Sequence, residues 1–131
     1  MIRWAKKADI NKIKKMVDSF EGDIDTFTKK YYERIIKEGI LLVAEENKKL
    51  VGVCFGNYKT KEKWADLLGV VVIPEFRKKG IASSLIKEFE SFVKKNKLKT
   101  IYLYADKKEK KLFKKLQYKQ GKTYVSFTKK F

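Results

Sequence analysis

The sequence predicts an α/β (α+β) domain in which a mixed sheet packs against helices. Short apolar segments bounded by turns are typical of strands, and several occur along the chain. Other stretches carry apolar residues every three or four positions, as amphipathic helices do. One such helix lies between two expected strands, and a strand–helix–strand unit makes its strands parallel with a right-handed crossover. At 131 residues, the chain is expected to form a single domain, 1–131.

The expected strands are Ile2–Trp4, Ile40–Ala44, Leu50–Tyr58, Trp64–Ile73, Thr100–Tyr104 and Lys122–Thr128. A polar turn, Glu45–Lys49, joins two of them into a hairpin. In the last one, Thr123, Val125 and Phe127 alternate onto one side, as a half-buried strand requires.

Four helices are expected between these strands. The first has Asp9 as its N-cap and an apolar face of Ile10, Ile13, Met16, Val17 and Phe20. The second starts at Asp25 or Thr26, carries Phe27, Tyr31 and Ile35 on one face, and ends near Gly39. The third runs from Gly80 to about Asn96, and the fourth is short and basic, Lys107 to Leu116.

The net charge of +17 invites a nucleic-acid role, because phosphate backbones attract clustered cations. However, only Arg3, Arg34 and Arg77 of the 33 cations are arginines, the residue that base recognition prefers. The lysines are also spread over every segment. A solvated lysine-rich surface, as in proteins of heat-loving organisms, is therefore favoured, and the nucleic-acid role stays open.

Histidine is absent and Cys54 is the only cysteine, so a His/Cys metal site is excluded and no metal is expected. Cys54 lies in an apolar run and is expected to pack in the core. No apolar run is long enough to cross a membrane, and the N-terminus lacks the apolar segment of a secretory signal. We therefore expect a cytoplasmic protein without a membrane partner.

The stretch Val70–Leu85 combines an apolar strand, a proline turn, three consecutive cations, a glycine and an amphipathic helix. Cations at a helix start are unfavourable, because the helix dipole already makes that end positive. They become favourable when an anion binds the exposed N–H groups, and phosphate binds well at such ends. Gly80 and Ala82 allow a ligand to approach the backbone. The stretch therefore predicts a phosphate-binding turn.

The pattern Val70-x-Val72-x-Pro74, Arg77-x-x-Gly80-x-Ala82 and Leu85 resembles the acetyl-CoA motif of the GNAT superfamily of N-acetyltransferases. The expected order of strands and helices is similar to that family over essentially the whole chain. The resemblance implies a mostly antiparallel mixed sheet with one parallel pair and helices on both faces. It also implies acetyl-CoA as co-substrate and direct attack of a primary amine on the thioester.

The resemblance further implies which residues hold the cofactor. Backbone N–H groups from Lys78 to Ser83 would bind its pyrophosphate, and Arg77 and Lys79 would add positive charge. The N–H of Val72 would polarise the thioester carbonyl. The implied cofactor-binding residues are Val70, Val71, Val72, Arg77, Lys78, Lys79, Gly80, Ile81, Ala82 and Ser83.

The chain departs from the family where protons are moved. The position of the family's proton-donating tyrosine is Phe113, which cannot donate a proton, and Gln117 stands where a glycine is usual. Tyr104 is the candidate replacement acid. The alternatives are a structural role for Tyr104, as an aromatic that covers the sheet, and protonation of the thiolate by water. Asp66 is the candidate base, and a solvated residue at the end of the strand is the structural alternative, which is favoured. In a regular strand Asp66 would face the same side as Val70 and Val72, and a bulge would break that relation; a chain of waters is the alternative base.

The loop between the first two helices forms a lip over the acceptor site in GNAT folds, and here it contains Asp18, Glu21, Asp23 and Asp25. Glu21, Asp23 and Asp25 are therefore candidate acceptor-binding residues for a cationic small-molecule, peptide or protein amine. Helix capping and solubility are the alternative. Two functions stay open: an acetyl-CoA-dependent N-acetyltransferase, or a catalytically decayed basic protein of the same fold that binds nucleic acid or ribosomes. A monomer and a homodimer both remain open.

Overall fold

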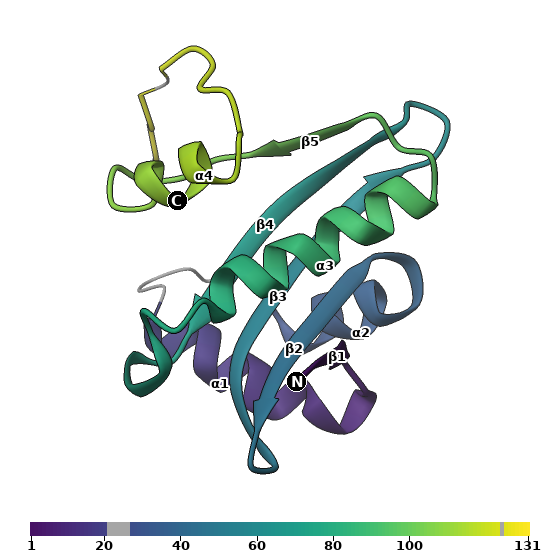
Figure 1. Cartoon of the computed structure of the whole chain (residues 1–131), viewed down its shortest axis with the longest axis vertical. Helices are drawn as coiled ribbons and strands as arrows, with labels where there is room; N and C mark the ends of the chain where they lie inside the picture. The colour runs from purple at the N-terminus through teal and green to yellow at the C-terminus, as the bar shows by residue number, and fades with distance from the viewer. Residues whose placement is uncertain (21–26, 124) are drawn as a thin grey trace.

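The computed structural model describes residues 1–20, 27–123 and 125–131, which form a five-stranded sheet with helices on both faces (Figure 1). The strand order follows the chain, and every neighbouring pair is antiparallel except the last, β4–β5, which is parallel. The predicted mixed sheet is thereby confirmed. The strands are β1 (Ile2–Trp4), β2 (Ile40–Glu46), β3 (Lys49–Lys59), β4 (Trp64–Val72) and β5 (Thr100–Leu103).

Helix α3 (Ile81–Lys95) covers one face of the sheet, and α1 (Ile10–Phe20) and α2 (Lys29–Glu38) cover the other. The side chains of β3 show this division. A Cβ on Gly52 would lie 3.2 Å from the side chain of Leu85 in α3. Phe55, on the opposite side of the strand, has its ring centroid 5.6 Å from that of Tyr32 in α2.

The N-terminal helices differ from prediction at their starts. Asp9 is not the N-cap of α1 but the last residue of a 3-10 turn, Lys7–Asp9, that leads into it. Its carboxylate accepts a hydrogen bond from the N–H of Lys6 at 2.7 Å and pairs with Arg3 at 2.8 Å. The cap of α2 is Thr28, whose Oγ1 accepts the N–H of Tyr31. The predicted caps Asp25 and Thr26 lie outside the described residues.

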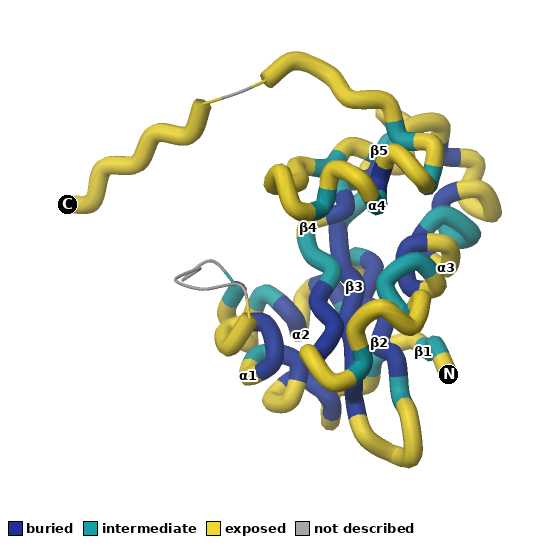
Figure 2. The backbone as a smooth tube through the Cα atoms, turned by 60° about the vertical axis from the view of Figure 1, so that its left-hand side comes forward, coloured by how far each residue is buried: buried dark blue, intermediate teal, exposed yellow. Residues whose placement is uncertain are grey.

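The predicted strand Lys122–Thr128 is wrong for the described residues of that segment, which form neither helix nor strand. The last helix, α4 (Lys110–Lys115), is also shorter than expected. In Figure 2 the described residues from Lys119 onward are exposed, and the end of this segment extends away from the sheet. An alternating pattern makes a strand only where a partner edge is available, and no strand pairs with the described residues there.

A β-bulge lies in the middle of β4. Phe55 pairs with Gly69 and the next residue, Gly56, pairs with Leu67, so Leu68 is the extra residue. Gly56 permits this close approach, because a Cβ there would overlap the carbonyl oxygen of Asp66. The pairing of β4 with β5 ends at Leu67 and Leu103. Beyond the bulge, the two strands therefore separate (Figure 1).

Within the described residues, no helix has the length and apolar character needed to cross a bilayer. The same residues contain no group of three or more Cys, Asp or Glu side chains placed to hold a metal ion.

Candidate active site

The edge of β4 that faces β5 is open beyond the bulge. The N–H of Ile73, next after β4, donates to Val51 of β3 at 2.9 Å. Because backbone groups alternate in direction along a strand, the N–H groups of Val72 and Val70 point away from β3. That of Val71 points toward β3. Val70 and Val72 therefore present backbone donors along the edge where β5 no longer pairs.

The turn after β4 is held by Arg77. Its Nε donates to the carbonyl oxygen of Val72 at 2.8 Å, and its guanidinium lies 5.5 Å from the ring centroid of Phe20 at the end of α1. The exposed Lys79 has its Nζ 5.0 Å from the ring centroid of Phe76. The side chains of Arg77 and Lys79 thus stand beside the turn, where they add positive potential.

The start of α3 lies directly after this turn. Gly80 caps the helix with φ = 79°, in the left-handed region that glycine adopts without strain, and Lys78 has φ = 62°. The N–H of Ser84 donates to the carbonyl of Gly80 at 3.0 Å as the first bond of the helix. The N–H groups of the three preceding residues, 81–83, therefore precede the helical hydrogen bonds and can bind an anion.

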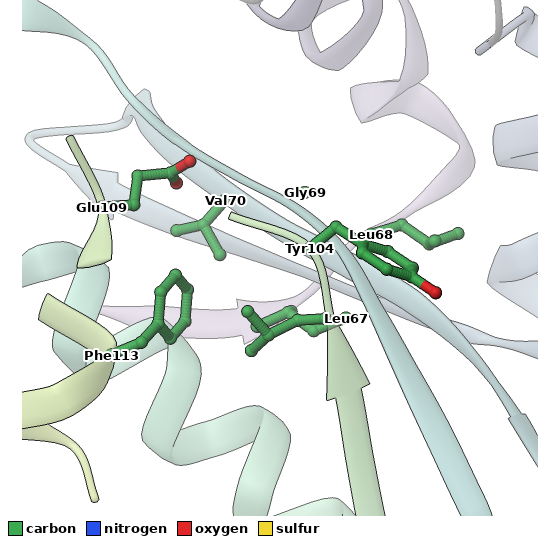
Figure 3. Close-up of a pocket in the computed structure, with 8 residues that line it drawn as sticks. Leu67, Leu68, Gly69, Val70, Tyr104, Glu109 and Phe113 are labelled. Carbon is green, nitrogen blue, oxygen red and sulfur yellow. The ribbon is translucent and has the colours of Figure 1, made fainter. Parts of the chain in front are cut away.

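A pocket of about 60 Å³ lies where β4 and β5 separate (Figure 3). Its volume is close to that of two water molecules, so it matches the end of a ligand better than a whole cofactor. The side chains of Glu109 and Phe113 enter it from the segment of α4 and lie beside Val70. The lining residues are Leu67, Leu68, Gly69, Val70, Leu103, Tyr104, Glu109 and Phe113.

Glu109 is a pocket residue that the sequence analysis missed. Burial raises the pKa of its carboxyl, even though the N–H of Asp106 donates to it at 3.4 Å and opposes the shift. Four lysines surround Glu109 in the sequence, which suggests a solvated residue. The informative signal was its spacing: Glu109 precedes Phe113 by four positions, so both project from one side of a helical segment.

Tyr104, the candidate acid, follows β5 and also lines the pocket. Its side chain is 88% exposed, and in Figure 3 its ring points away from Glu109 and Phe113. Phe113, at the family's tyrosine position, is 7% exposed and packs in the pocket. The role of Tyr104 stays a prediction, with its hydroxyl directed away from the pocket wall made by α4.

Asp66, the candidate base, does not face the same side as Val70 and Val72. The bulge at Leu68 changes the alternation, so Asp66 pairs with Asn57 on the face covered by α1 and α2. Burial raises the pKa of its carboxyl. Tyr31 of α2 lies near it: burial is the main cause of the raised pKa of Tyr31, and Asp66 contributes in the same direction.

The candidate acceptor residues Glu21, Asp23 and Asp25 lie outside the described residues. Asp18, at the edge of the same loop, is described. Its carboxylate is exposed and pairs with Lys14 of the preceding helical turn at 2.8 Å.

A larger groove of about 520 Å³ is lined by residues of α1, of the β2–β3 hairpin and of the segment that directly follows β4. Its floor is apolar, with Met16, Leu50 and Ile73, and four lysines stand around it. These are Lys12, Lys15, Lys48 and Lys49. The groove is larger than the pocket, but it does not contain the open edge of β4.

The donor set at the turn fits a phosphate-bearing thioester. Free helix N–H groups and the cations of Arg77, Lys78 and Lys79 suit the phosphates, and the open edge of β4 suits an extended arm with amide groups. The small pocket at the end of that edge suits the reacting group. The structure thus brings together the predicted cofactor-binding residues Gly80–Ser83, Arg77 and Val72.

Comparisons with known proteins concern the family and the fold. The sequence model of the acetyltransferase (GNAT) family matches residues 2–118. No curated protein sequence matches the chain. An acetyltransferase of Trypanosoma brucei has a similar structure, with 14% identity, a TM-score of 0.80 and 98% of each chain covered.

Two aminoglycoside acetyltransferases are also similar in structure. The enzyme AAC(6')-Iy in complex with CoA has 15% identity and a TM-score of 0.80, with 100% of both chains covered. One from an uncultured soil metagenomic sample, in complex with sisomicin, has 17% identity and a TM-score of 0.73, with 99% of this chain and 96% of that chain covered. At these identities, the likeness shows a common fold.

Proposed function

Because the chain belongs to the acetyltransferase (GNAT) family, we propose that it transfers the acetyl group of acetyl-CoA to a primary amine. The observation that carries the proposal is the open edge of β4, which leads from the helix start at Gly80 to the pocket beside Val70. The cofactor phosphates would bind the N–H groups of Ile81, Ala82 and Ser83, with charge from Arg77, Lys78 and Lys79. We also place the protein in the cytoplasm.

The chain's own groups have distinct roles in this reaction. The N–H of Val72 donates to the thioester carbonyl and stabilises the negative charge that develops on it. Val70 and Val71 shape the strand along which the arm lies. The side chain of Asp66 lies on the face of β4 opposite to the side chains of Val70 and Val72. It takes the proton that the attacking amine loses, directly or through water. No covalent enzyme intermediate is required, so the absence of histidine is compatible with catalysis.

The acceptor is proposed to be a small cationic amine. Two structural relatives are aminoglycoside acetyltransferases, and one of them is in complex with sisomicin. In this chain the acids Glu21, Asp23 and Asp25 would attract the acceptor's positive charge. Replacing Asp23 and Asp25 with Asn should raise the Michaelis constant for a cationic acceptor, measured over a panel of amines with labelled acetyl-CoA. An unchanged constant would remove these acids from the acceptor site.

Acetyl-CoA binding tests the cofactor half of the proposal. A ligand at 100 times its dissociation constant stabilises the folded state by about 2.7 kcal/mol, so the melting temperature should rise by several degrees. Gly80→Glu should abolish the rise, because a carboxylate would stand beside the phosphates. Gly121→Glu is the control for the added carboxylate, since Gly121, like Gly80, has nothing within 4 Å of an added Cβ; Gly80→Ala, which carries the backbone strain at φ = 79° without the charge, should keep most of the rise. No rise with the unchanged protein would refute the cofactor assignment.

The lysine-lined groove supports a second candidate function, the binding of a polyanion such as RNA. Its four lysines, Lys12, Lys15, Lys48 and Lys49, could neutralise phosphates, and affinity would then fall steeply with salt. Steep salt dependence without any response to acetyl-CoA would favour this binding protein over the enzyme. Replacing Lys12 and Lys15 with Gln should then make the affinity for RNA less dependent on salt. The same replacement of Lys94 and Lys95, in the last turn of α3, is the control.

A further inference from the structure

The pocket between β4 and α4 is lined by apolar residues apart from two titratable side chains, Tyr104 and Glu109. The pocket has no tyrosine on α4, because that position is Phe113. The ring of Tyr104 points away from Phe113, whereas the carboxyl of Glu109 lies beside Val70 on the side of the pocket made by the α4 segment (Figure 3). Glu109 is therefore the acid that the fold directs toward the place where the reacting group would lie.

We propose that Glu109 is the general acid of this chain and protonates the sulfur of CoA as the acetyl group leaves. The assignment rests on the proposed acetyl transfer. In this assignment the family's tyrosine at position 113 is replaced in its role by the carboxylic acid of Glu109, which lies four residues earlier and on the same side of the helical segment. Phe113 then serves as an apolar wall that keeps water away from the carboxyl.

The surroundings of Glu109 favour its protonated form. Burial is the largest cause of its raised pKa, and the nearby carboxylate of Asp106 acts in the same direction. The lysines that flank it in sequence, Lys107, Lys108, Lys110 and Lys111, are all exposed and extend into solvent. The pocket-lining residues that belong to β4 and β5 are apolar and carry no charge. The carboxylate of Glu90 in α3 accepts a hydrogen bond from the hydroxyl of Tyr118 at 2.8 Å.

The proton balance of the step is complete. A bond forms between the amine nitrogen and the acetyl carbon, and the carbon–sulfur bond breaks with its electron pair on sulfur. The Glu109 carboxyl gives its proton to that sulfur and becomes a carboxylate. The nitrogen loses its extra proton to Asp66 or water, and Glu109 regains a proton from solvent. The products are the acetylated amine and CoA in its thiol form.

A binding experiment that needs no acceptor amine tests the position of Glu109. A carboxylate beside the CoA sulfur opposes the thiolate form, so the affinity of the unchanged protein for CoA should fall between pH 7 and pH 9.5. In Glu109→Gln the affinity for CoA should fall less over this pH range. The difference should be about tenfold for each pKa unit by which the Glu109 carboxylate raises the pKa of the bound thiol. Desulfo-CoA, which lacks the sulfur, should bind both proteins with one pH dependence. Glu62→Gln, an exposed substitution on the β3–β4 turn, should behave like the unchanged protein.

Turnover then tests the proton transfer. In the unchanged protein, kcat should fall as pH rises through the pKa of Glu109, and Glu109→Gln should lower kcat and remove this limb. Adding Phe113→Tyr to Glu109→Gln should restore part of kcat, because a phenol again enters the pocket.

Identical pH dependence of CoA binding in Glu109→Gln and the unchanged protein would overturn the assignment. So would loss of the limb in Tyr104→Phe rather than in Glu109→Gln. Absence of CoA binding in the unchanged protein would instead refute the proposed function, and the assignment with it.

Discussion

The Nε atom of Arg77 donates to the carbonyl oxygen of Val72 at 2.8 Å and so ties the end of the phosphate-binding turn to the last residue of β4. Since the N–H of Val72 is the proposed donor to the thioester carbonyl, one side chain links the two halves of the cofactor site. Its planar guanidinium also lies over Phe20, 5.5 Å from the ring centroid. Arg77 thus supplies a positive charge and also positions the turn relative to β4. A lysine, which has no planar guanidinium, cannot do the second.

Arg77→Lys, which keeps the charge, should weaken acetyl-CoA binding by about tenfold, because a hydrogen bond from a charged donor contributes about 1.5–3 kcal/mol. Lys78→Ala removes a charge at the neighbouring position but leaves the bond to Val72, so it should weaken binding less. Titration calorimetry at one salt concentration compares the two. If Arg77→Lys binds as tightly as the unchanged protein, charge alone accounts for the contribution of Arg77.

The bulge in β4 depends on Gly56 of β3, where a Cβ would overlap the carbonyl oxygen of Asp66. Gly56→Ala should therefore destabilise the protein by about 1–3 kcal/mol, the usual cost of overpacking. Urea denaturation measures the change, and Gly121→Ala, in open space, is the control that should leave the midpoint unchanged. A midpoint unchanged in Gly56→Ala would mean that the bulge does not need this close approach.

The pattern from Val70 to Ser83 predicted the turn and the helix start because strand, glycine and helix are encoded locally there. The bulge at Leu68 could not be predicted in the same way. One extra residue in the apolar run of β4 leaves no mark in the sequence, although it turns Asp66 to the opposite face. Only the pairing with β3 reveals it.

Two other features depended on tertiary contacts. The segment Lys122–Thr128 has the alternation of a strand, but pairing decides whether a strand forms, and the described residues there have no pairing partner. Glu109 lies in a run of lysines typical of a solvated surface, yet its carboxyl enters the pocket. Its burial follows from how the short α4 packs against β4, which local sequence does not specify.

Asp9 is held more firmly than a capping residue. Arg3 donates to both of its carboxylate oxygens, at 2.8 and 3.1 Å, and the N–H of Lys6 donates at 2.7 Å. The hydrogen bonds from Arg3 are the main cause of its lowered pKa. Asp9→Asn should therefore destabilise the protein by about 1–3 kcal/mol at pH 7.

The pH dependence of this loss follows from the direction of the shift. A carboxyl with a lowered folded-state pKa contributes stability that is fully present above its unfolded pKa, about 4, and is lost as pH falls through the folded value. The difference between Asp9→Asn and the unchanged protein should thus shrink below about pH 4. Asp18→Asn is the control, because its exposed pair with Lys14 contributes about 0–1 kcal/mol. Equal losses in the two variants would contradict a special role for Asp9.

Asp66 should behave in the opposite way, because burial raises its pKa and no stabilising cation is among the causes of the shift. Its protonated form is favoured by folding, so its contribution to stability is greatest below the unfolded pKa and is lost as pH rises through the folded value. Asp66→Asn removes this loss. The variant should melt at a higher temperature than the unchanged protein at pH 7, with the advantage disappearing near pH 4.

If Asp66 is the base, the same variant should have a lower kcat, since Asn cannot accept the amine proton. A more stable and less active variant would identify Asp66 as a functional carboxylate that the fold holds at a cost in stability. A variant less stable than the unchanged protein at pH 7 would instead show that the carboxylate is stabilised by its surroundings, as a structural residue would be.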